Sequence, residues 1–288
     1  MANTKLEKLN LLDKFLFDET MEDKEAYQAA IGILLENEVE LLEKPVTEKE
    51  FRVSPQLREI RLDVIGIDKE KKLYHTEMQQ RNTGNLVRRS RYYQAQLDVS
   101  LLEPGCKDFN LLNESCFILI APFDVFGRGL YRYTFEGVCR ECQDLKLEDG
   151  AVRIFINTKG RNREDFSREF LDFMEYIGKT TDETAERAAG NRIKKIHERV
   201  RSVRKSEKAG VKYMQRWEEL AYAREDGDLQ RVVSLVCKKI KKNKTLEEIT
   251  DDLEEEVSVI EPIYNTAKEF APVYDPALVF EQVRSESR

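Results

Sequence analysis

Two neighbouring stretches of alternating apolar and polar residues constrain the fold of this chain most strongly. Residues 58–67 and 73–79 place apolar side chains at nearly every second position, and the polar segment 68–72 separates them. Alternation with a period of two is typical of a half-buried β-strand, because successive side chains point to opposite faces of a sheet. A short polar segment between two such strands favours a hairpin. We therefore expect an antiparallel strand pair in the fold.

The symmetry of this hairpin predicts which residues face each other. If it is symmetric about residue 70, Ile65 faces His75 and Asp63 faces Glu77. Directly opposed side chains have Cβ atoms about 5 Å apart. A slip of one residue would move the two carboxylates to opposite faces of the sheet. The symmetric register thus predicts a close pair of acidic side chains.

Two carboxylates at this spacing repel each other unless a cation lies between them. A hard divalent cation such as Mg²⁺ or Mn²⁺ prefers carboxylate oxygens, water and substrate phosphate as ligands. The alternative is an ordinary solvated pair, or one neutralised by an arginine, and Arg61 is an available partner. The hairpin residues alone leave both interpretations open.

The rest of the chain predicts further helices and strands. Apolar spacing indicates helices at 24–36 and 85–102, and short apolar runs indicate strands at 116–121, 131–135 and 152–157. The segment with Pro45 and Pro55 reads as a loop or a short strand. After about residue 160 the pattern is helical, with capping boxes expected at Thr180–Glu183 and Thr245–Glu248. We expect a mixed α/β domain at 1–160 and a helical region at 161–288.

Composition and charge exclude several classes of protein. The 288 residues are 41% hydrophobic and carry a net charge of −7, which suits a globular chain without a uniformly basic surface. The sequence has no run of 18 apolar residues, which a membrane span needs, and it lacks the apolar segment of a secretory signal near the N-terminus. We therefore expect a cytoplasmic protein without membrane contact. Five cysteines fit reduced thiols, and the spacing of Cys139 and Cys142 lacks the second pair that a zinc site needs.

Three short motifs in order along the chain resemble a known superfamily. They are Arg61-Leu62-Asp63-Val64, then Glu77-Met78-Gln79, then Arg88-Arg89-Ser90-Arg91-Tyr92 on a predicted helix. This order is similar to the PD-(D/E)XK nucleases, and more narrowly to the recombination-promoting nuclease and putative transposase group. The segment LLDKFLFDE at 11–19 resembles the opening of that group less specifically. The resemblance covers about residues 10–160.

The resemblance implies a fold, an activity and a set of site residues. The fold would be a restriction-endonuclease-like mixed sheet flanked by helices, with a helical C-terminal extension. The activity would be metal-dependent hydrolysis of DNA phosphodiester bonds, associated with transposition or recombination. Asp63 and Glu77 would hold Mg²⁺ or Mn²⁺, with the Met78 carbonyl as a further ligand. Gln79 would be catalytic, although it stands where most of the wider superfamily has a lysine, and a neutral amide can only hydrogen-bond.

Other residues of the motifs are candidates for DNA contact or metal binding. Arg88 and Arg91 lie three residues apart on a helix, so they share a face and could hold phosphates, with Tyr92 bracing the site. Tyr93, in phase with Leu86 and Leu97, is expected in the core instead. A glutamate from the first helix, Glu36 or Glu38, could add a metal ligand, but neither is fixed by spacing.

The C-terminal half leaves two interpretations open. The basic stretch 192–216 could contact phosphates, or it could be a solvated face that pairs with the acidic segment 247–256. We expect His197, in this stretch, to be exposed. An apolar stripe along the predicted helices at 246–260 suits packing, either in a core or between two chains of a homodimer. The alternative to an enzyme is a DNA-binding or interaction protein that keeps the nuclease fold with little or no activity.

Overall fold

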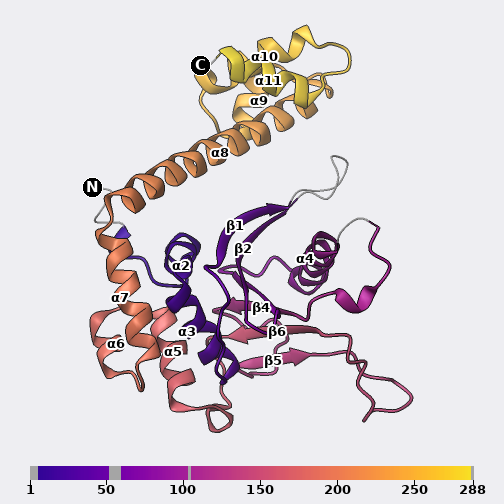
Figure 1. Cartoon of the computed structure of the whole chain (residues 1–288). Coiled ribbons are helices and arrows are strands. Elements are labelled where there is room, and N and C mark those ends of the chain that lie inside the picture. The colour runs from indigo at the N-terminus through magenta and orange to yellow at the C-terminus, as the bar shows by residue number, and fades with distance from the viewer. Residues whose placement is uncertain (1–5, 52–59, 103–104, 287–288) are drawn as a thin grey trace. The chain divides into compact units, whose positions relative to one another are not determined.

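The computed structural model describes residues 6–51, 60–102 and 105–286. The chain divides into two compact units, Met1–Tyr213 and Met214–Arg288, called unit 1 and unit 2 below. Unit 1 contains a six-stranded sheet with helices on both faces (Figure 1). Among the described residues, no helix is both long enough and apolar enough to cross a membrane.

The sheet of unit 1 is mixed, with strand order β1-β2-β3-β4-β6-β5. The strands are β1 (Val46–Phe51), β2 (Ile60–Ile67), β3 (Leu73–Met78), β4 (Ser115–Ala121), β5 (Arg132–Phe135) and β6 (Ala151–Asn157). Strands β1, β2 and β3 pair antiparallel, β3, β4 and β6 pair parallel, and β5 runs antiparallel to β6. The expectation of an α/β fold with a mixed sheet flanked by helices is therefore confirmed. Strand β1 falls in the segment expected to be a loop or a short strand.

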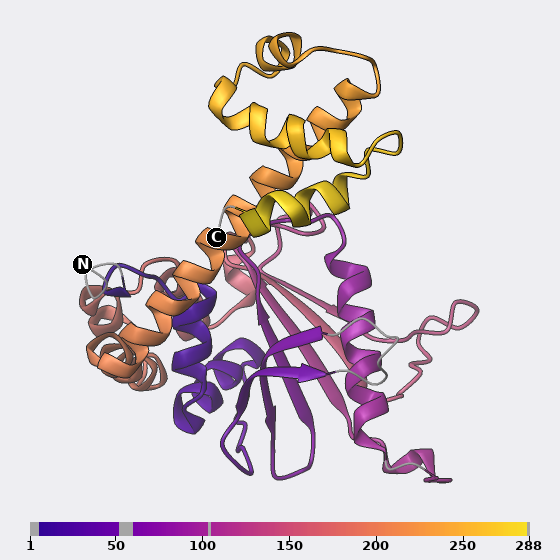
Figure 2. The ribbon, with the colours of Figure 1, turned by 90° about the horizontal axis from the view of Figure 1, so that it is seen from above.

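Helices cover the two faces of the sheet unequally (Figures 1 and 2). One face carries α2 (Lys14–Met21), α3 (Lys24–Leu35), α5 (Arg168–Gly178), α6 (Asp182–Arg187) and α7 (Arg192–Lys205), whose apolar side chains share the larger core. The other face carries α4 (Leu86–Leu101) and two smaller apolar clusters. Short 3-10 helices lie at Phe109–Leu111 and Arg163–Asp165.

The hairpin of β2 and β3 has the predicted register. Ile65 pairs with His75 and Ile67 with Leu73, as symmetry about residue 70 requires. The polar connection closes because Asp68 accepts a hydrogen bond from the backbone N–H of Lys72 at 2.8 Å. Lys71 takes a positive φ of 65° in this turn. A polar turn that is tied to its own backbone fixes the register of both strands.

A buried tyrosine fastens the same hairpin from within β3. The hydroxyl of Tyr74 donates to the carboxylate of Asp68 at 2.8 Å. Burial, and then the hydrogen bond to this carboxylate, raise the pKa of Tyr74 well above its usual range. The raised pKa favours the neutral hydroxyl, which is the form that donates this hydrogen bond.

The predicted helix starts are partly right. At the N-terminus of α9 (Leu246–Leu253), the Thr245 side chain accepts from the Glu248 N–H, and Glu248 accepts from the Thr245 N–H, which is the expected capping box. The box expected at Thr180 lies one residue later, because Thr181 caps α6. Thr180 is buried instead, and its hydroxyl donates to the Tyr176 carbonyl at 2.9 Å.

Unit 2 is helical and has its own core. It holds most of α8 (Glu207–Ile240), then α9, α10 (Val257–Glu269) and α11 (Pro276–Glu286). From the predicted stripe, Ile249 and Ile260 are fully buried in this core, whereas Val257 is about half exposed.

The compact units divide at residues 213 and 214, rather than at the expected boundary near 160. The change to helical pattern near 160 is real, since every described strand lies before Thr158. However, the next three helices, α5 to α7, bury their apolar faces in the core that covers the sheet. A change in secondary structure along the chain does not mark a domain boundary when the new elements complete the same core.

Candidate functional site

The candidate site lies where β2 begins and β3 ends. These strands are antiparallel, so Asp63, near the start of β2, lies beside Glu77, near the end of β3. Both side chains are buried, with exposed fractions of 3% and 5%. Buried carboxylates are costly without partners, so each must be neutralised or hydrogen-bonded where it lies.

The two carboxylates join the strands directly at this end of the hairpin. The N–H of Asp63 donates to Oε1 of Glu77 at 3.1 Å, and the N–H of Met78 donates to Oδ2 of Asp63 at 3.0 Å. The described backbone pairing of β2 with β3 runs as far as Val64 and Thr76. At the next residues, these bonds between side chains and backbone connect the two strands instead. The predicted proximity of Asp63 and Glu77 is therefore present in the structure.

A lysine from another element neutralises Asp63. The ammonium of Lys14, in the first turn of α2, contacts Oδ1 of Asp63 and lies 3.1 Å from Oδ2 of the buried Asp18. The Lys14 side chain is 31% exposed, so this lysine is only partly buried at the site. Arg61, the available partner in the alternative interpretation without a metal ion, pairs with Glu50 of β1.

A histidine holds Glu77 from the same strand. Nε2 of His75 lies 2.7 Å from Oε1 of Glu77, two residues along the same face of β3. His75 is 2% exposed and packs edge-on against Phe117 of β4, with ring centroids 5.1 Å apart. This packing fixes the imidazole, and the imidazole in turn fixes the orientation of the Glu77 carboxylate. The predicted position of His75 opposite Ile65 is confirmed.

Gln79 is hydrogen-bonded to an arginine of α4. Its Oε1 accepts a hydrogen bond from the guanidinium of Arg89, and its Nε2 donates to the Arg81 carbonyl at 2.6 Å. The Arg89 guanidinium also lies over the Tyr93 ring, 5.6 Å from its centroid. A positive charge therefore lies next to Gln79, although Gln79 itself is neutral.

The other predicted DNA contacts lie on the outside of α4. Arg88 and Arg91 are exposed, and Tyr92 is at the border of exposure, with a fraction of 36%. The arginine of this run that reaches the end of β3 is Arg89. The spacing already held the signal, because Arg89 lies four residues before Tyr93, which was expected to face the core.

The glutamates considered as extra metal ligands have other partners. Glu36 ends α3 with a positive φ of 55°, lies 3.5 Å from Arg132 and accepts from the Ser167 N–H at 2.8 Å. Glu38 is exposed and lies 3.8 Å from Arg192. The acidic residue of the first helices that approaches Asp63 is Asp18, through the shared ammonium of Lys14.

The expectation of an exposed His197 is wrong. This histidine is 6% exposed on the inner face of α7, where Nδ1 lies 2.8 Å from the Tyr176 hydroxyl and Nε2 lies 2.7 Å from Asp182. The hydrogen bond from His197 holds the pKa of Asp182 below its usual range. Within the basic stretch, Arg204 donates to the carbonyls of Leu9 and Thr180. Part of this stretch therefore serves to hold helices together.

Asp63 and Glu77 are the two carboxylates that a divalent cation would meet at this site. Within the described ranges, no three or more His, Cys, Asp and Glu side chains are grouped closely enough to hold a metal ion. Mg²⁺ typically takes one or two carboxylates and completes its shell with water and substrate phosphate. The Lys14 ammonium shows that a cation reaches Oδ1 of Asp63. A metal ion here would share Asp63 with this ammonium or displace it.

The chain matches no family model, no curated protein and no solved structure.

Proposed function

We propose that the chain is a metal-dependent DNA endonuclease of the transposase- or recombination-associated type. The observation that carries this proposal is the buried pair of Asp63 and Glu77. A folded protein keeps two adjacent carboxylates out of water at a considerable cost, which a bound divalent cation would offset. The motif resemblance to PD-(D/E)XK nucleases, with their restriction-endonuclease-like fold, supports the same assignment.

Asp63 and Glu77 would hold Mg²⁺ or Mn²⁺ together with the Met78 carbonyl. A divalent cation at such a site lowers the pKa of a bound water and polarises a phosphoryl oxygen. The chain contributes the geometry. His75 orients Glu77, and the Met78 N–H orients Asp63, so that both carboxylates are held in place before substrate arrives.

The cations around the pair supply the charge that Gln79 lacks. Arg89 can form a bidentate contact with a phosphate oxygen pair, while Gln79 fixes the orientation of its guanidinium. Lys14 lies on the other side, at Asp63, and can offset negative charge that develops on the phosphate. Together they take the place that a lysine at position 79 has in the wider superfamily.

The ion pair of Lys14 with Asp63 also favours a second candidate function. A lysine that permanently neutralises Asp63 would leave a protein that keeps the fold and binds DNA without cutting it. The two functions differ in one property, because only the enzyme needs Lys14 to give way to, or coexist with, a divalent cation.

Cleavage of supercoiled plasmid tests the proposal. We expect nicking with Mg²⁺ or Mn²⁺ and none with EDTA. Asp63→Asn and Glu77→Gln each lower the nicking rate by at least about 100-fold, because the metal supplies several kcal/mol of transition-state stabilisation. The matched control is Glu70→Gln, which removes an exposed carboxylate from the turn of the same hairpin and leaves the rate unchanged.

The outcomes separate the two functions. If the wild-type protein binds DNA but does not nick it with either metal ion, the non-catalytic function is favoured. Variants of Asp63 and Glu77 that nick as fast as wild type would place the catalytic centre elsewhere and contradict the proposal.

A further inference from the structure

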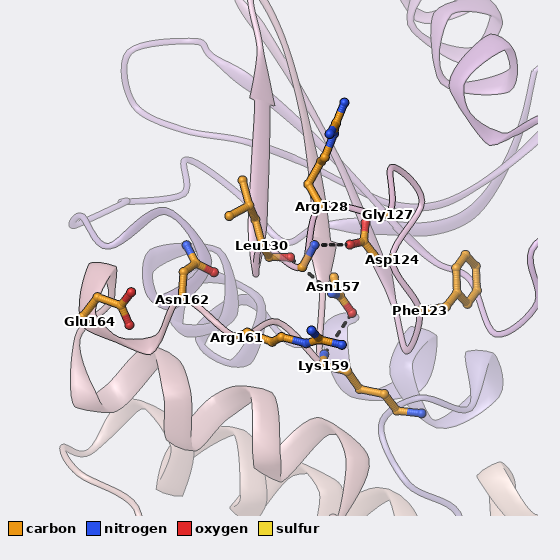
Figure 3. Close-up of a pocket in the computed structure, with 11 residues that line it drawn as sticks. Phe123, Asp124, Gly127, Arg128, Leu130, Asn157, Lys159, Arg161, Asn162 and Glu164 are labelled. Atoms are coloured by element: carbon orange, nitrogen blue, oxygen red, sulfur yellow. Dashed lines mark hydrogen bonds between the residues drawn. The ribbon is translucent and has the colours of Figure 1, made fainter.

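A second polar site lies on the same edge of the sheet, where β4 and β6 end. Here the loop after β4 and the loop after β6 enclose a pocket of about 600 Å³ (Figure 3). Its lining includes the cationic side chains of Arg128, Lys159 and Arg161. None of these residues belongs to the three motifs, and the proposed cleavage chemistry does not use them.

Backbone hydrogen bonds connect this pocket to the candidate site across the sheet. The Gln79 N–H donates to the Ile120 carbonyl of β4 at 2.9 Å, and the Thr158 N–H donates to the Ala121 carbonyl at 2.9 Å. Since β3, β4 and β6 are parallel, their carboxyl ends share one edge. Strands are about 4.8 Å apart, so the end of β6 lies on the order of 10 Å from the end of β3. A polynucleotide at this edge can reach both places.

The three cations of the pocket are available to a ligand. Arg128, Lys159 and Arg161 are exposed, and none of them forms an ion pair with any residue that the structure describes. By contrast, nearby Arg132 is paired with Glu36. Clustered cations repel one another, and a bound anion relieves that repulsion. The pocket is therefore suited to a negatively charged group.

The two acidic residues of the lining, Asp124 and Glu164, offset only part of the charge of the three cations. Asp124 is engaged by its own loop, accepting hydrogen bonds from the N–H of Gly129 at 2.6 Å and the hydroxyl of Tyr133 at 2.8 Å. Burial raises the pKa of Asp124, but these hydrogen bonds outweigh it and hold the pKa below its usual range. In Figure 3, Glu164 lies on the far side of Asn162 from Arg128 and Lys159.

The loops that carry the cations are fixed to each other. The Arg161 N–H donates to the Gly129 carbonyl at 2.7 Å, and the Tyr131 N–H donates to Oδ1 of Asn162 at 2.8 Å. Gly129 takes a φ of +77°, which glycine adopts without strain, and the Arg161 side chain packs against it. Cations on a rigid frame lose less entropy when they bind, so such a frame favours binding.

We infer that this pocket binds a backbone phosphate of the DNA strand, a few nucleotides from the bond that is cut. The inference rests on the proposed function, which places the cleaved bond at Asp63 and Glu77. Arginine forks match the geometry of phosphate oxygens, and phosphate contacts set the register of a nucleic acid on its protein. With one phosphate per 3.4 Å of helix axis in each strand, a separation on the order of 10 Å spans a few nucleotides.

The salt dependence of DNA binding tests the inference. Binding of a labelled duplex is measured by anisotropy in EDTA, so that no strand is cut, between 50 and 200 mM salt. We expect the double variant Lys159→Gln/Arg161→Gln to bind about tenfold more weakly at low salt and to lower the salt slope by about 2. Arg128→Gln, as an independent variant, lowers the slope by about 1.

The matched control removes the same charge outside the pocket. Arg140→Gln/Arg163→Gln changes two exposed arginines, of which Arg163 lies next to the pocket without lining it. We expect the salt slope of this control to equal that of wild type. An equal fall in both double variants would mean that the overall charge is responsible, and it would overturn the inference, as would an unchanged slope in Lys159→Gln/Arg161→Gln.

Two further experiments are needed. The first distinguishes a free nucleotide from a DNA phosphate as the ligand, and the second distinguishes failure of this inference from failure of the proposed function. Calorimetric binding of deoxyadenosine monophosphate that is lost in Lys159→Gln/Arg161→Gln, with the DNA salt slope unchanged, would show a free-nucleotide site and overturn the inference. Wild type that cuts DNA while the pocket variants bind it normally would refute the pocket alone. If the wild-type protein does not cut DNA with any metal ion, and the pocket variants lose DNA binding, the nuclease function is refuted. The inference that the pocket binds a DNA phosphate then still holds.

Discussion

At the scale of single residues, Lys14 explains how the chain tolerates the buried carboxylate of Asp63. Asp63 and Glu77 are nearly inaccessible to solvent, and the only formal positive charge that the described residues bring to Asp63 is the Lys14 ammonium. The same ammonium contacts Asp18. The ion pair therefore offsets the charge of Asp63, and a metal ion bound there would have to compete with it.

Replacing Lys14 tests this balance. We expect Lys14→Met to lower the free energy of unfolding by about 1–3 kcal/mol, because a buried carboxylate loses its charged partner. We also expect Mn²⁺ to raise the melting temperature of this variant more than that of wild type, because the metal ion no longer competes with the ammonium. Thermal unfolding with and without Mn²⁺ measures both effects.

The control for this prediction is Lys44→Met, which removes an exposed lysine that pairs with Glu22. Surface changes of this kind shift stability by less than about 0.5 kcal/mol. An identical Mn²⁺ response in Lys14→Met and wild type would show that the ammonium and the metal ion do not share Asp63.

His75 is a positioning residue, and its replacement has a specific expected signature. Nε2 of His75 holds Oε1 of Glu77, so His75→Gln loosens a carboxylate without removing it. Loss of a partner that orients a metal ligand typically weakens metal affinity by about 10–100-fold. We expect the Mg²⁺ concentration for half-maximal nicking to rise by this factor, with the rate at saturating Mg²⁺ near that of wild type. A fall in the saturating rate at an unchanged Mg²⁺ requirement would contradict this role.

Sequence reasoning reached some site residues and missed others for a physical reason. The register of Asp63 and Glu77 follows from local symmetry of the hairpin, and the structure has that register. Lys14 is 49 residues before Asp63, so only the packing of α2 against the sheet brings it to the site. No local pattern encodes such a contact.

At the scale of elements, apolar runs located β4, β5 and β6 better than they located β1. Runs of apolar residues predicted β4, β5 and β6 to within one residue at either end. Strand β1 has the mixed sequence VTEKEF, which carries little apolar alternation, and its pairing with β2 makes it a strand. For β1, tertiary pairing outweighs the signal in its own side chains.

In unit 2, one carboxylate joins α8 to α9 and makes stability depend on pH. The hydrogen bond from Lys239 at 2.7 Å, and then that from Lys244, lower the pKa of Asp252 to about 2. An unperturbed Asp has a pKa of about 3.9. A carboxylate whose pKa is lower in the folded state stabilises the fold above its unfolded pKa, and this contribution disappears as pH falls toward the folded pKa.

We therefore expect Asp252→Asn to lower the melting temperature at pH 7, and the difference from wild type to shrink between about pH 4 and pH 2. Circular dichroism of the helical signal measures both values. Asp251→Asn is the matched control, because Asp251 is exposed on the same helix and forms no ion pair with a described residue. A difference that persists undiminished at low pH would contradict the assignment of the pKa shift.

At the scale of the whole molecule, the candidate site and the inferred phosphate pocket both belong to unit 1. Within unit 1, the first residues of α8 contact α2, since Lys212 pairs with Glu19 and Tyr213 packs against Phe15. Unit 2 has a separate core built from α8 to α11. The sequence predicted the helical nature of the C-terminal region, but which helices belong to the sheet depends on long-range packing that periodicity does not show.

This division predicts the effect of truncation. A chain that ends at Leu220 keeps the contacts of Lys212 and Tyr213, and we expect it to nick plasmid at a rate within about twofold of the full chain under the same metal conditions. Gel assays of matched concentrations measure this rate, and circular dichroism checks that the shortened chain is folded. A folded but inactive truncated chain would mean that unit 2 contributes to catalysis.

The central claim is that Asp63 and Glu77 together bind a divalent cation, and Mn²⁺ binding followed by electron paramagnetic resonance tests it most directly. The signal of free Mn²⁺ disappears on binding, so a titration gives the number of sites and their affinity without any DNA. We predict one site per chain in wild type and in Glu70→Gln, weakened at least about tenfold in Asp63→Asn and in Glu77→Gln. Equal Mn²⁺ binding by all four proteins, or none by wild type, would contradict the account.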